Sequence, residues 1–387
     1  MRSVSVIGIG ETKMGKFPER SLRDLILEAG DKAISDSGAE KERIEALYLG
    51  NFNASFWCLQ SHMGPMVSEV LGLGGIPTIR TEGACATGSL AFRQGLIAVA
   101  AGVYDVVLVG GVEKMTHRPT ETVTTGLASA ADAHFEVGLG ATFPSLFAMI
   151  ANRYFYEYGN VREQMAICAV QNHNNALLNP DAQIHKKITV EDVYNGFPVA
   201  FPLTVYDCSL ISDGACFVVL AATEVAREFC KKTMVEVIGS GHAGDTLTMA
   251  AKGSMTTLGA TVLAATEAYT MANIGPGDIN FAEVHDCFTI TQLINVEDLG
   301  FFEKGMAAAA ISDGKTALTG TIPINPSGGL KAKGHPIGCT GLSQIYEAVT
   351  QIRGEAGARQ IKNAEIGLTH NLGGSAATCL VSIFRGR

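Results

Sequence analysis

Charged side chains are scarce in this sequence. They make up 17% of its 387 residues, whereas an average soluble domain has about 25%. Hydrophobic residues reach 47%, so the composition is that of a chain with a large packed core. Basic residues are also few, since 29 Lys and Arg against 38 Asp and Glu give a formal charge of −9. Without a basic cluster, and with a single tryptophan, the sequence excludes nucleic-acid binding.

Long hydrophobic runs and paired cysteines are missing too. The longest apolar stretch, residues 95–112, is broken by Tyr104 and Asp105, so it is not a membrane span. The first residues lead directly into a strand pattern, without the parts of a signal peptide. Nine cysteines without any Cys-x-x-Cys pair argue against a disulfide framework and a zinc ribbon. We therefore expect a reduced, cytoplasmic protein with no membrane contact, no bound metal and no cofactor.

The chain contains a regular alternation of strand and helix patterns. Glycine is abundant, with 44 residues, and it often lies between these patterns. In the first part Ser21 and Asp24 form a capping box at the start of a helix. We expect strands over residues 3–10, 46–50, 77–81, 106–111 and 217–220, and helices over 22–37, 60–71 and 89–101. This alternation predicts an α/β fold with helices on both faces of the sheet.

A second round of the same pattern follows. We expect strands over residues 235–241, 281–285, 366–370 and 378–384, and helices over 258–273, 288–299 and 340–353. The strand signal fades between residues 116 and 195, which we interpret as an inserted cap. The sequence thus predicts two related halves, residues 1–233 with the insertion at about 116–195, and residues 234–387.

Cys85 is the most informative single residue. It follows a predicted strand and precedes a predicted helix, between Gly83 and Gly88. Small neighbours allow a substrate to approach the sulfur, and the helix N-terminus is expected to favour the thiolate. Cys85 is therefore a candidate nucleophile.

Two histidines are candidates for proton transfer. His335 lies in a glycine-rich run, residues 328–341, and a sharply turning backbone would present it to a cleft. His285 begins the sequence His-Asp-Cys-Phe at the end of a predicted buried strand, and Cys287 adds a second thiol there. If the halves are duplicates, these turns face Cys85 at one edge of the sheets. Such a set could in principle bind zinc, but its members lie on separate turns, which argues against a structural metal.

Two glycines also lie in residues 371–375, Asn-Leu-Gly-Gly-Ser, between the last two predicted strands. A turn there could direct backbone N–H groups at an oxyanion. The early Gly8-Ile9-Gly10 has Lys13 where a third glycine would be needed, so a dinucleotide fingerprint is absent.

Four motifs in this order resemble the thiolase superfamily over nearly the whole chain. They are the Cys85 turn, Ser209 with Ser212-Asp213-Gly214-Ala215, Gly334-His335-Pro336-Ile337-Gly338, and the final glycine turn. The His-Asp-Cys-Phe sequence is similar to that of archaeal and bacterial acetyl-CoA acetyltransferases related to sterol-carrier-protein-type thiolases. The resemblance implies a five-layer αβαβα fold with two pseudo-twofold halves and a cap over the coenzyme A site.

The resemblance also implies a set of roles. Cys85 is the acylated nucleophile, His335 its base and an oxyanion donor, and Cys287 the second acid and base. A water held by His285 and the N–H of Gly373 complete the oxyanion holes, and Ser209 contacts the pantetheine arm. Asp286 is expected to be a structural partner.

One position departs from the family. Most thiolases carry a catalytic cysteine where this chain has Asn371, and Ser375 replaces the last glycine of that motif. We expect Cys287 to supply the missing thiol.

The implied activity is the Claisen condensation of two acetyl-CoA molecules into acetoacetyl-CoA, feeding the mevalonate pathway. Implied partners are a second copy of the chain (a dimer or tetramer), a zinc-ribbon/OB-fold companion that binds coenzyme A, and hydroxymethylglutaryl-CoA synthase. A degradative 3-ketoacyl-CoA thiolase for longer chains and a non-catalytic lipid- or CoA-binding protein remain alternatives.

Overall fold

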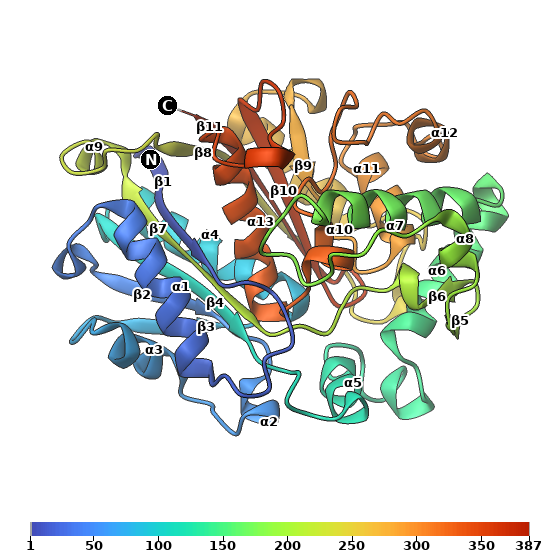
Figure 1. Ribbon diagram of the computed structural model, residues 1–387, viewed down its shortest axis with the longest axis horizontal. Coiled ribbons are helices and arrows are strands. Elements are labelled where there is room, and N and C mark those ends of the chain that lie inside the picture. Colours follow the sequence, from blue (N-terminus) through green and yellow to red (C-terminus); the bar gives the residue numbers. More distant parts are fainter. Residues whose placement is uncertain (1, 387) are drawn as a thin grey trace.

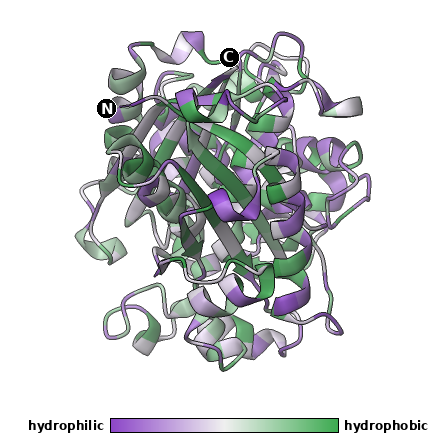
Figure 2. Cartoon of the chain, turned by 90° about the vertical axis from the view of Figure 1, so that its left-hand side faces the viewer, coloured by the Kyte–Doolittle hydropathy of each residue, from purple (hydrophilic) through white to green (hydrophobic). Residues whose placement is uncertain are grey.

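A large mixed sheet forms the centre of the computed structural model, which describes residues 2–386 (Figure 1). Its strands lie in the order β3-β2-β4-β7-β1-β8-β11-β10-β9. Their bounds are β1 Val4–Glu11, β2 Ala46–Gly50, β3 Thr78–Thr81, β4 Val106–Glu113, β7 Gly214–Ala222, β8 Val235–Gly244, β9 Phe281–Glu283, β10 Ile366–Gly373 and β11 Thr378–Gly386. Figure 2 shows hydrophobic residues concentrated in these strands.

The two halves of the sheet have the same succession of parallel and antiparallel neighbouring strands. In the first half β2 is parallel to β3 and β4, β4 is antiparallel to β7, and β7 is antiparallel to β1. In the second half β9 is parallel to β10 and to a single bridge at Ile324, while β11 is antiparallel to β10 and β8. The halves join where β1 pairs with β8. The predicted internal duplication is therefore present in the strand order.

Helices separate and cover the two halves. Between them α4 (Thr87–Ala100) packs on α13 (Ile337–Ile352), as Figure 1 shows near the centre of the molecule. On the outer faces α1 (Leu22–Ser37) and α3 (Met63–Leu71) cover the first half, and α10 (Gly259–Ala272) covers the second. This arrangement gives the predicted five layers.

The ends of α1 show how local sequence sets an element. Ser21 accepts the N–H of Asp24, and the Asp24 carboxylate accepts the N–H of Ser21, which is the predicted capping box. Gly38 ends the helix with a positive φ of 72°. The face that carries Leu25 and Ile26 is buried against the sheet.

The segment between β4 and β7 is mainly helical. It contains α5 (Thr120–Ala128), α6 (Phe143–Tyr158), α7 (Arg162–Ala176), α8 (Val190–Tyr194) and a separate two-stranded sheet of β5 (Pro198–Ala200) and β6 (Leu203–Thr204). No strand of this segment joins the large sheet. Among the described residues no helix is long and apolar enough to cross a membrane.

The last glycine turn is shorter than the sequence predicts. Asn371, Leu372 and Gly373 continue β10 and pair with Leu380, Cys379 and Thr378. The reversal of the chain occurs only at residues 374–377. Asn371 and Leu372 are fully buried, so burial and strand pairing override the glycine signal there.

Glycines leave room for the start of α13. The carbonyl oxygen of Gly338 lies where side chains of Gly50, Gly88 and Gly111 would project. A Cβ at Gly111 would lie 2.3 Å from that oxygen, and a Cβ at Gly50 or Gly88 would lie 3.0 Å from it. The position of the α13 N-terminus therefore depends on three residues without side chains.

Replacing Gly111 by alanine should thus force α13 away from β4. We expect Gly111→Ala to lower the free energy of unfolding by about 1–3 kcal/mol, as overpacked cores do. Chemical denaturation measures it. Gly74→Ala is the matched control because nothing lies within 4 Å of its added Cβ. Equal stability of the two variants would contradict this account of the packing.

Candidate active site

Cys85 lies in the short 3-10 turn Ala84–Ala86, between β3 and the N-terminus of α4. Ala84 has a positive φ of 49°, which marks the sharp turn that precedes the cysteine. The backbone N–H of Gly374 points at the Cys85 sulfur and lowers its pKa. The turn after β10 therefore meets the turn after β3 at the sulfur atom.

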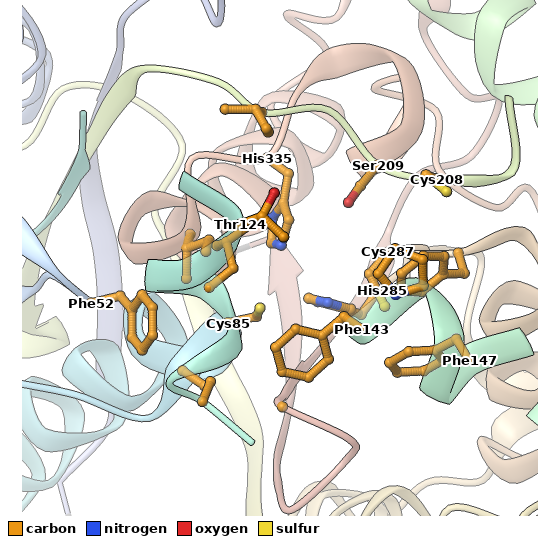
Figure 3. Close-up of a pocket in the computed structure, with 18 residues that line it drawn as sticks. Phe52, Cys85, Thr124, Phe143, Phe147, Cys208, Ser209, His285, Cys287 and His335 are labelled. Carbon is orange, nitrogen blue, oxygen red and sulfur yellow. The ribbon is translucent and has the colours of Figure 1, made fainter. Parts of the chain in front are cut away.

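The predicted reactive residues share one cavity. The Cys85 sulfur, a ring nitrogen of His285 and a ring nitrogen of His335 all lie within 4.8 Å of one another. Cys287 and Ser209 line the same cavity, which has a volume of about 200 Å³. Figure 3 shows these five side chains around a common space, with Phe143 and Phe147 along another side.

The remaining walls of the cavity are mostly apolar and come from the cap and from both halves. They are Phe52, Ala84, Thr124, Leu127, Ala130, Phe143, Pro144, Phe147, Cys208, Ile211, Phe288, Ile337 and Gly374. Gly374 lines both this cavity and a neighbouring one, and Gly373 lines only the neighbouring one. The N–H at the resting Cys85 sulfur is that of Gly374, and the role of the Gly373 N–H toward an oxyanion stays a prediction.

His335 is held from both its backbone and its ring. Its N–H donates to Ser212 Oγ at 2.9 Å. Its Nδ1 lies 2.7 Å from the hydroxyl of Thr340, which itself donates to the carbonyl oxygen of Pro336 at 3.1 Å. Because that hydroxyl has one proton, it must accept from Nδ1–H, and Nε2 is left unprotonated. His335 can therefore accept a proton at Nε2.

His285 and Cys287 follow β9. The ring of His285 stands nearly perpendicular to that of His335, at 85°, with the centroids 5.3 Å apart. The sulfur of Cys287 is 3.8 Å from Thr291 Oγ1. The carbonyl oxygen of Cys287 accepts the N–H of Ser209 at 2.8 Å, so the Ser209 segment is fastened to this turn.

Comparison with known proteins decides the family. The family model of the thiolase N-terminal domain matches residues 4–224, and that of the thiolase C-terminal domain matches residues 241–386. The chain belongs to the thiolase family. The predicted enzyme class, an acyltransferase of the thiolase type, is confirmed.

Relatives span the full chain. A protein of Methanothermobacter thermautotrophicus named acetyl-CoA acetyltransferase is 49% identical over 384 residues, covering 99% of this chain and 100% of its own. Another with that name, from Methanocaldococcus jannaschii, is 44% identical and covers 99% of both chains. Sterol carrier protein 2 of Gallus gallus is 35% identical over 96% of this chain and 70% of its own length.

Solved structures agree with the fold. The Ltp2-ChsH2(DUF35) aldolase superposes with a TM-score of 0.86 at 27% identity, covering 98% of this thiolase and 97% of that chain. The acetyl-CoA acetyltransferase from Syntrophomonas wolfei has a TM-score of 0.77 at 19% identity, with 100% and 99% covered. The predicted thiolase fold is therefore confirmed.

The charge state of the thiol differs from the sequence-based expectation. Burial raises the pKa of Cys85 to about 12, and the carboxylates of Glu113 and Glu82 act in the same direction. Burial also lowers the pKa of His335 to about 3. The expected lowering of the Cys85 pKa by backbone N–H groups is present, but the loss of solvation on burial outweighs it. Both shifts favour a neutral pair of Cys85 and His335.

The thiol of Cys287, the second thiol of the cavity, is also buried away from solvent. Burial, followed by the neighbouring Cys85, raises the pKa of Cys287 well above that of an ordinary cysteine. Burial, His335 and His370 lower the pKa of His285 well below its usual value. Burial thus favours the neutral form of all four reactive groups.

Two buried carboxylates support the site. Glu113, at the end of β4, accepts the N–H groups of Phe52, Asn53 and Gly338 at 2.8, 3.1 and 3.0 Å. Burial raises its pKa to about 7. Sequence reasoning missed it, although a carboxylate ending a fully apolar strand is a usable signal.

Asp286 has the structural contacts expected of it. It accepts the N–H groups of Leu330 and Lys331 at 2.7 and 3.2 Å and the amide of Asn172 at 2.7 Å. These bonds hold the glycine-rich segment that leads to His335.

The neutral pair predicts a characteristic pH dependence of alkylation. Only the thiolate reacts with iodoacetamide, and below its pKa the thiolate fraction grows about tenfold per pH unit. The rate of Cys85 alkylation should therefore keep rising between roughly pH 6 and 9. Peptide mapping by mass spectrometry follows the rate, with Cys85→Ser as the control for the modified position. A flat rate over this range would reveal a thiolate–imidazolium pair instead.

Proposed function

We propose that this thiolase is an acetyl-CoA C-acetyltransferase, which condenses two acetyl-CoA molecules into acetoacetyl-CoA and free coenzyme A. The observation that carries the proposal is the convergence of two thiols and two imidazoles on one largely apolar cavity. The acetyl-CoA acetyltransferase name of relatives at 49% and 44% identity supports the choice of substrate.

The first half-reaction acetylates Cys85. His335 Nε2 takes the thiol proton as the sulfur attacks the thioester carbonyl, so the thiolate forms only during attack. The N–H groups of Cys85 and Gly373 would donate to the tetrahedral oxyanion, beside the Gly374 N–H that points at the sulfur. When the intermediate collapses, the coenzyme A thiolate takes the proton of Cys287 and leaves as the free thiol. Cys287 is then a thiolate, and His335 is an imidazolium.

The second half-reaction forms the carbon–carbon bond. The Cys287 thiolate removes a proton from the methyl group of a second acetyl-CoA. The developing enolate oxygen is stabilised by the Nε2–H of the His335 imidazolium and by His285, directly or through a water. The enolate carbon attacks acetyl-Cys85, and the released Cys85 thiolate recovers its proton from His335. Every group returns to its starting state.

Ser209 is proposed to contact the pantetheine arm. Its side chain lines the cavity, and its backbone is bonded to the Cys287 turn. The cap helices α5 and α6 contribute Thr124, Phe143 and Phe147 to the cavity and would enclose the arm there.

We further propose that the enzyme acts in the cytoplasm as a homodimer or tetramer and feeds the mevalonate pathway. Hydroxymethylglutaryl-CoA synthase would be the consumer of its product. A zinc-ribbon/OB-fold companion is also proposed, and the DUF35 component in the name of the similar aldolase structure is in keeping with a partner protein. Co-expression followed by size-exclusion chromatography tests both partners, and separate elution would remove them from the proposal.

The cavity volume favours a second candidate, a 3-ketoacyl-CoA thiolase for longer chains. The cavity of about 200 Å³ exceeds the volume of about 150 Å³ that is enough to hold benzene. Comparison of kcat/KM for four-carbon and eight-carbon 3-ketoacyl-CoA separates the two. A preference for the longer substrate would replace the acetyl-CoA assignment.

Substitution of the two thiols should separate the half-reactions. We expect Cys85→Ser to lose both condensation and thiolysis by at least about 1,000-fold, as loss of a nucleophile does. Cys287→Ala should lose condensation by roughly 100- to 10,000-fold, the usual contribution of general acid–base catalysis. It should still form acetyl-Cys85, more slowly than the wild type because coenzyme A must then leave as the thiolate, and intact-mass spectrometry detects the acetyl group.

Cys230→Ala is the matched control, because that cysteine lies outside the cavity. It should keep wild-type rates. Full condensation activity in Cys287→Ala would contradict the role of the second thiol.

A further inference from the structure

Asn371 stands where most thiolases have a catalytic cysteine, and its side chain contacts a reactive residue. Its amide Nδ2 lies 2.9 Å from His285 Nδ1. The contact follows from strand pairing, because β10 and β9 are parallel with Thr369 opposite Glu283. Asn371, two residues further along β10, therefore comes beside His285, which lies two residues beyond the end of β9. Both side chains are fully buried.

This contact determines which nitrogen of His285 carries the proton. An amide N–H can only donate, so Nδ1 must accept and a neutral ring must hold its proton on Nε2. The ring is neutral because burial, together with His335 and His370, lowers its pKa well below the usual value. The backbone is also held, since the His285 N–H donates to His370 Nδ1 and Asn295 Nδ2 donates to the His285 carbonyl.

The Nε2–H group of His285 has no acceptor among residues 2–386, although it is buried. The ring borders the cavity that holds Cys85 and Cys287. A buried N–H donor without an acceptor costs free energy in the resting protein. A negatively charged oxygen in the cavity would remove that cost.

We propose that Asn371 is a positioning residue that keeps the His285 proton on Nε2, so that this N–H stabilises the enolate oxygen of the second acyl-CoA. The inference rests on the proposed function. It also explains the departure from the family pattern. Asn371 occupies the strand position where most thiolases have a thiol, and it orients the imidazole of His285. His285 belongs to the turn that supplies the replacement thiol, Cys287.

The near-isosteric variant Asn371→Asp reverses the polarity of this contact. At low pH the introduced carboxyl group and the His285 ring together hold one extra proton, on either partner, and Nε2 keeps its hydrogen. As the pH rises that proton is lost, the carboxylate accepts Nδ1–H, and Nε2 becomes bare. Loss of an oxyanion donor typically costs about 100- to 1,000-fold in rate. The variant should therefore lose activity with rising pH over a range in which the wild type does not.

The readout is exchange of the acetyl-CoA methyl protons with deuterated solvent, measured by mass spectrometry beside acetylation of Cys85. In Asn371→Asp, exchange should fall by about 100-fold at the alkaline end and recover at low pH. Cys85 acetylation should change by no more than roughly twofold, because that step uses no enolate. Asn371→Leu, which can neither donate nor accept, should show a smaller loss without the pH dependence.

Nitrogen NMR of histidine-labelled protein tests the proton position without any turnover. The inference requires His285 to carry hydrogen on Nε2 in the wild type and on Nδ1 in alkaline Asn371→Asp. Hydrogen on Nδ1 in the wild type, or unchanged exchange in Asn371→Asp at every pH, would overturn it. A wild-type enzyme that shows the Nε2–H state but exchanges no methyl protons would instead overturn the proposed function, and the catalytic part of this inference with it.

Discussion

The reaction cavity depends on the close approach of the first turns of α4 and α13, one from each half, at Gly88 and Gly341. Gly88 meets the backbone of Gly338 and Gly341, and Gly341 meets the backbone of Ser89. A Cβ at Gly341 would lie 2.4 Å from the Ser89 nitrogen. This contact places the Cys85 turn and the His335 segment within reach of each other, and β9 and β10 then add Cys287, His285 and Asn371.

Burial of these groups has a chemical consequence. In water a thiol near pKa 8.5 and an imidazole near 6.5 would be partly charged at about neutral pH. In this cavity burial moves both pKa values away from neutrality, which favours the uncharged thiol and imidazole over an ion pair before substrate arrives. In the proposed mechanism charge develops only in the transition state, where the Gly374 N–H and the histidine N–H groups can stabilise it. His335 then stores one proton between the two half-reactions.

Local signals in the sequence predicted the fold and much of the site. The capping box at Ser21, the buried strand that became β4 and the glycine-rich run at His335 all correspond to the structure. The His-Asp-Cys-Phe sequence indicated Cys287, motif resemblance added Ser209, and both residues line the cavity. These features could be predicted because each depends on residues close together in the chain.

What could not be predicted depends on contacts between distant segments. Residues 371–373 resemble a turn by composition, but they pair with β11 and are buried. The Gly374 N–H meets the Cys85 sulfur because the strand continues past its predicted end at residue 370 and reverses only after Gly373. The pKa of Cys85 moved opposite to expectation because burial, unlike a helix N-terminus, has no local sequence pattern. The structural role of Glu113 at the site is apparent only from the hydrogen bonds that its carboxylate accepts from Phe52 and Gly338.

The central claim is that Cys287, from the His-Asp-Cys-Phe turn, performs the proton transfer that other thiolases assign to the position of Asn371. A crystal structure of the Cys85-acetylated enzyme with a non-reactive acetyl-CoA thioether analogue tests it most directly. The account predicts that the analogue's methyl group contacts the Cys287 sulfur, while the oxygen of its acyl group faces His335 Nε2 and His285 Nε2. A methyl group that is screened from Cys287 and contacts another proton acceptor would contradict the account.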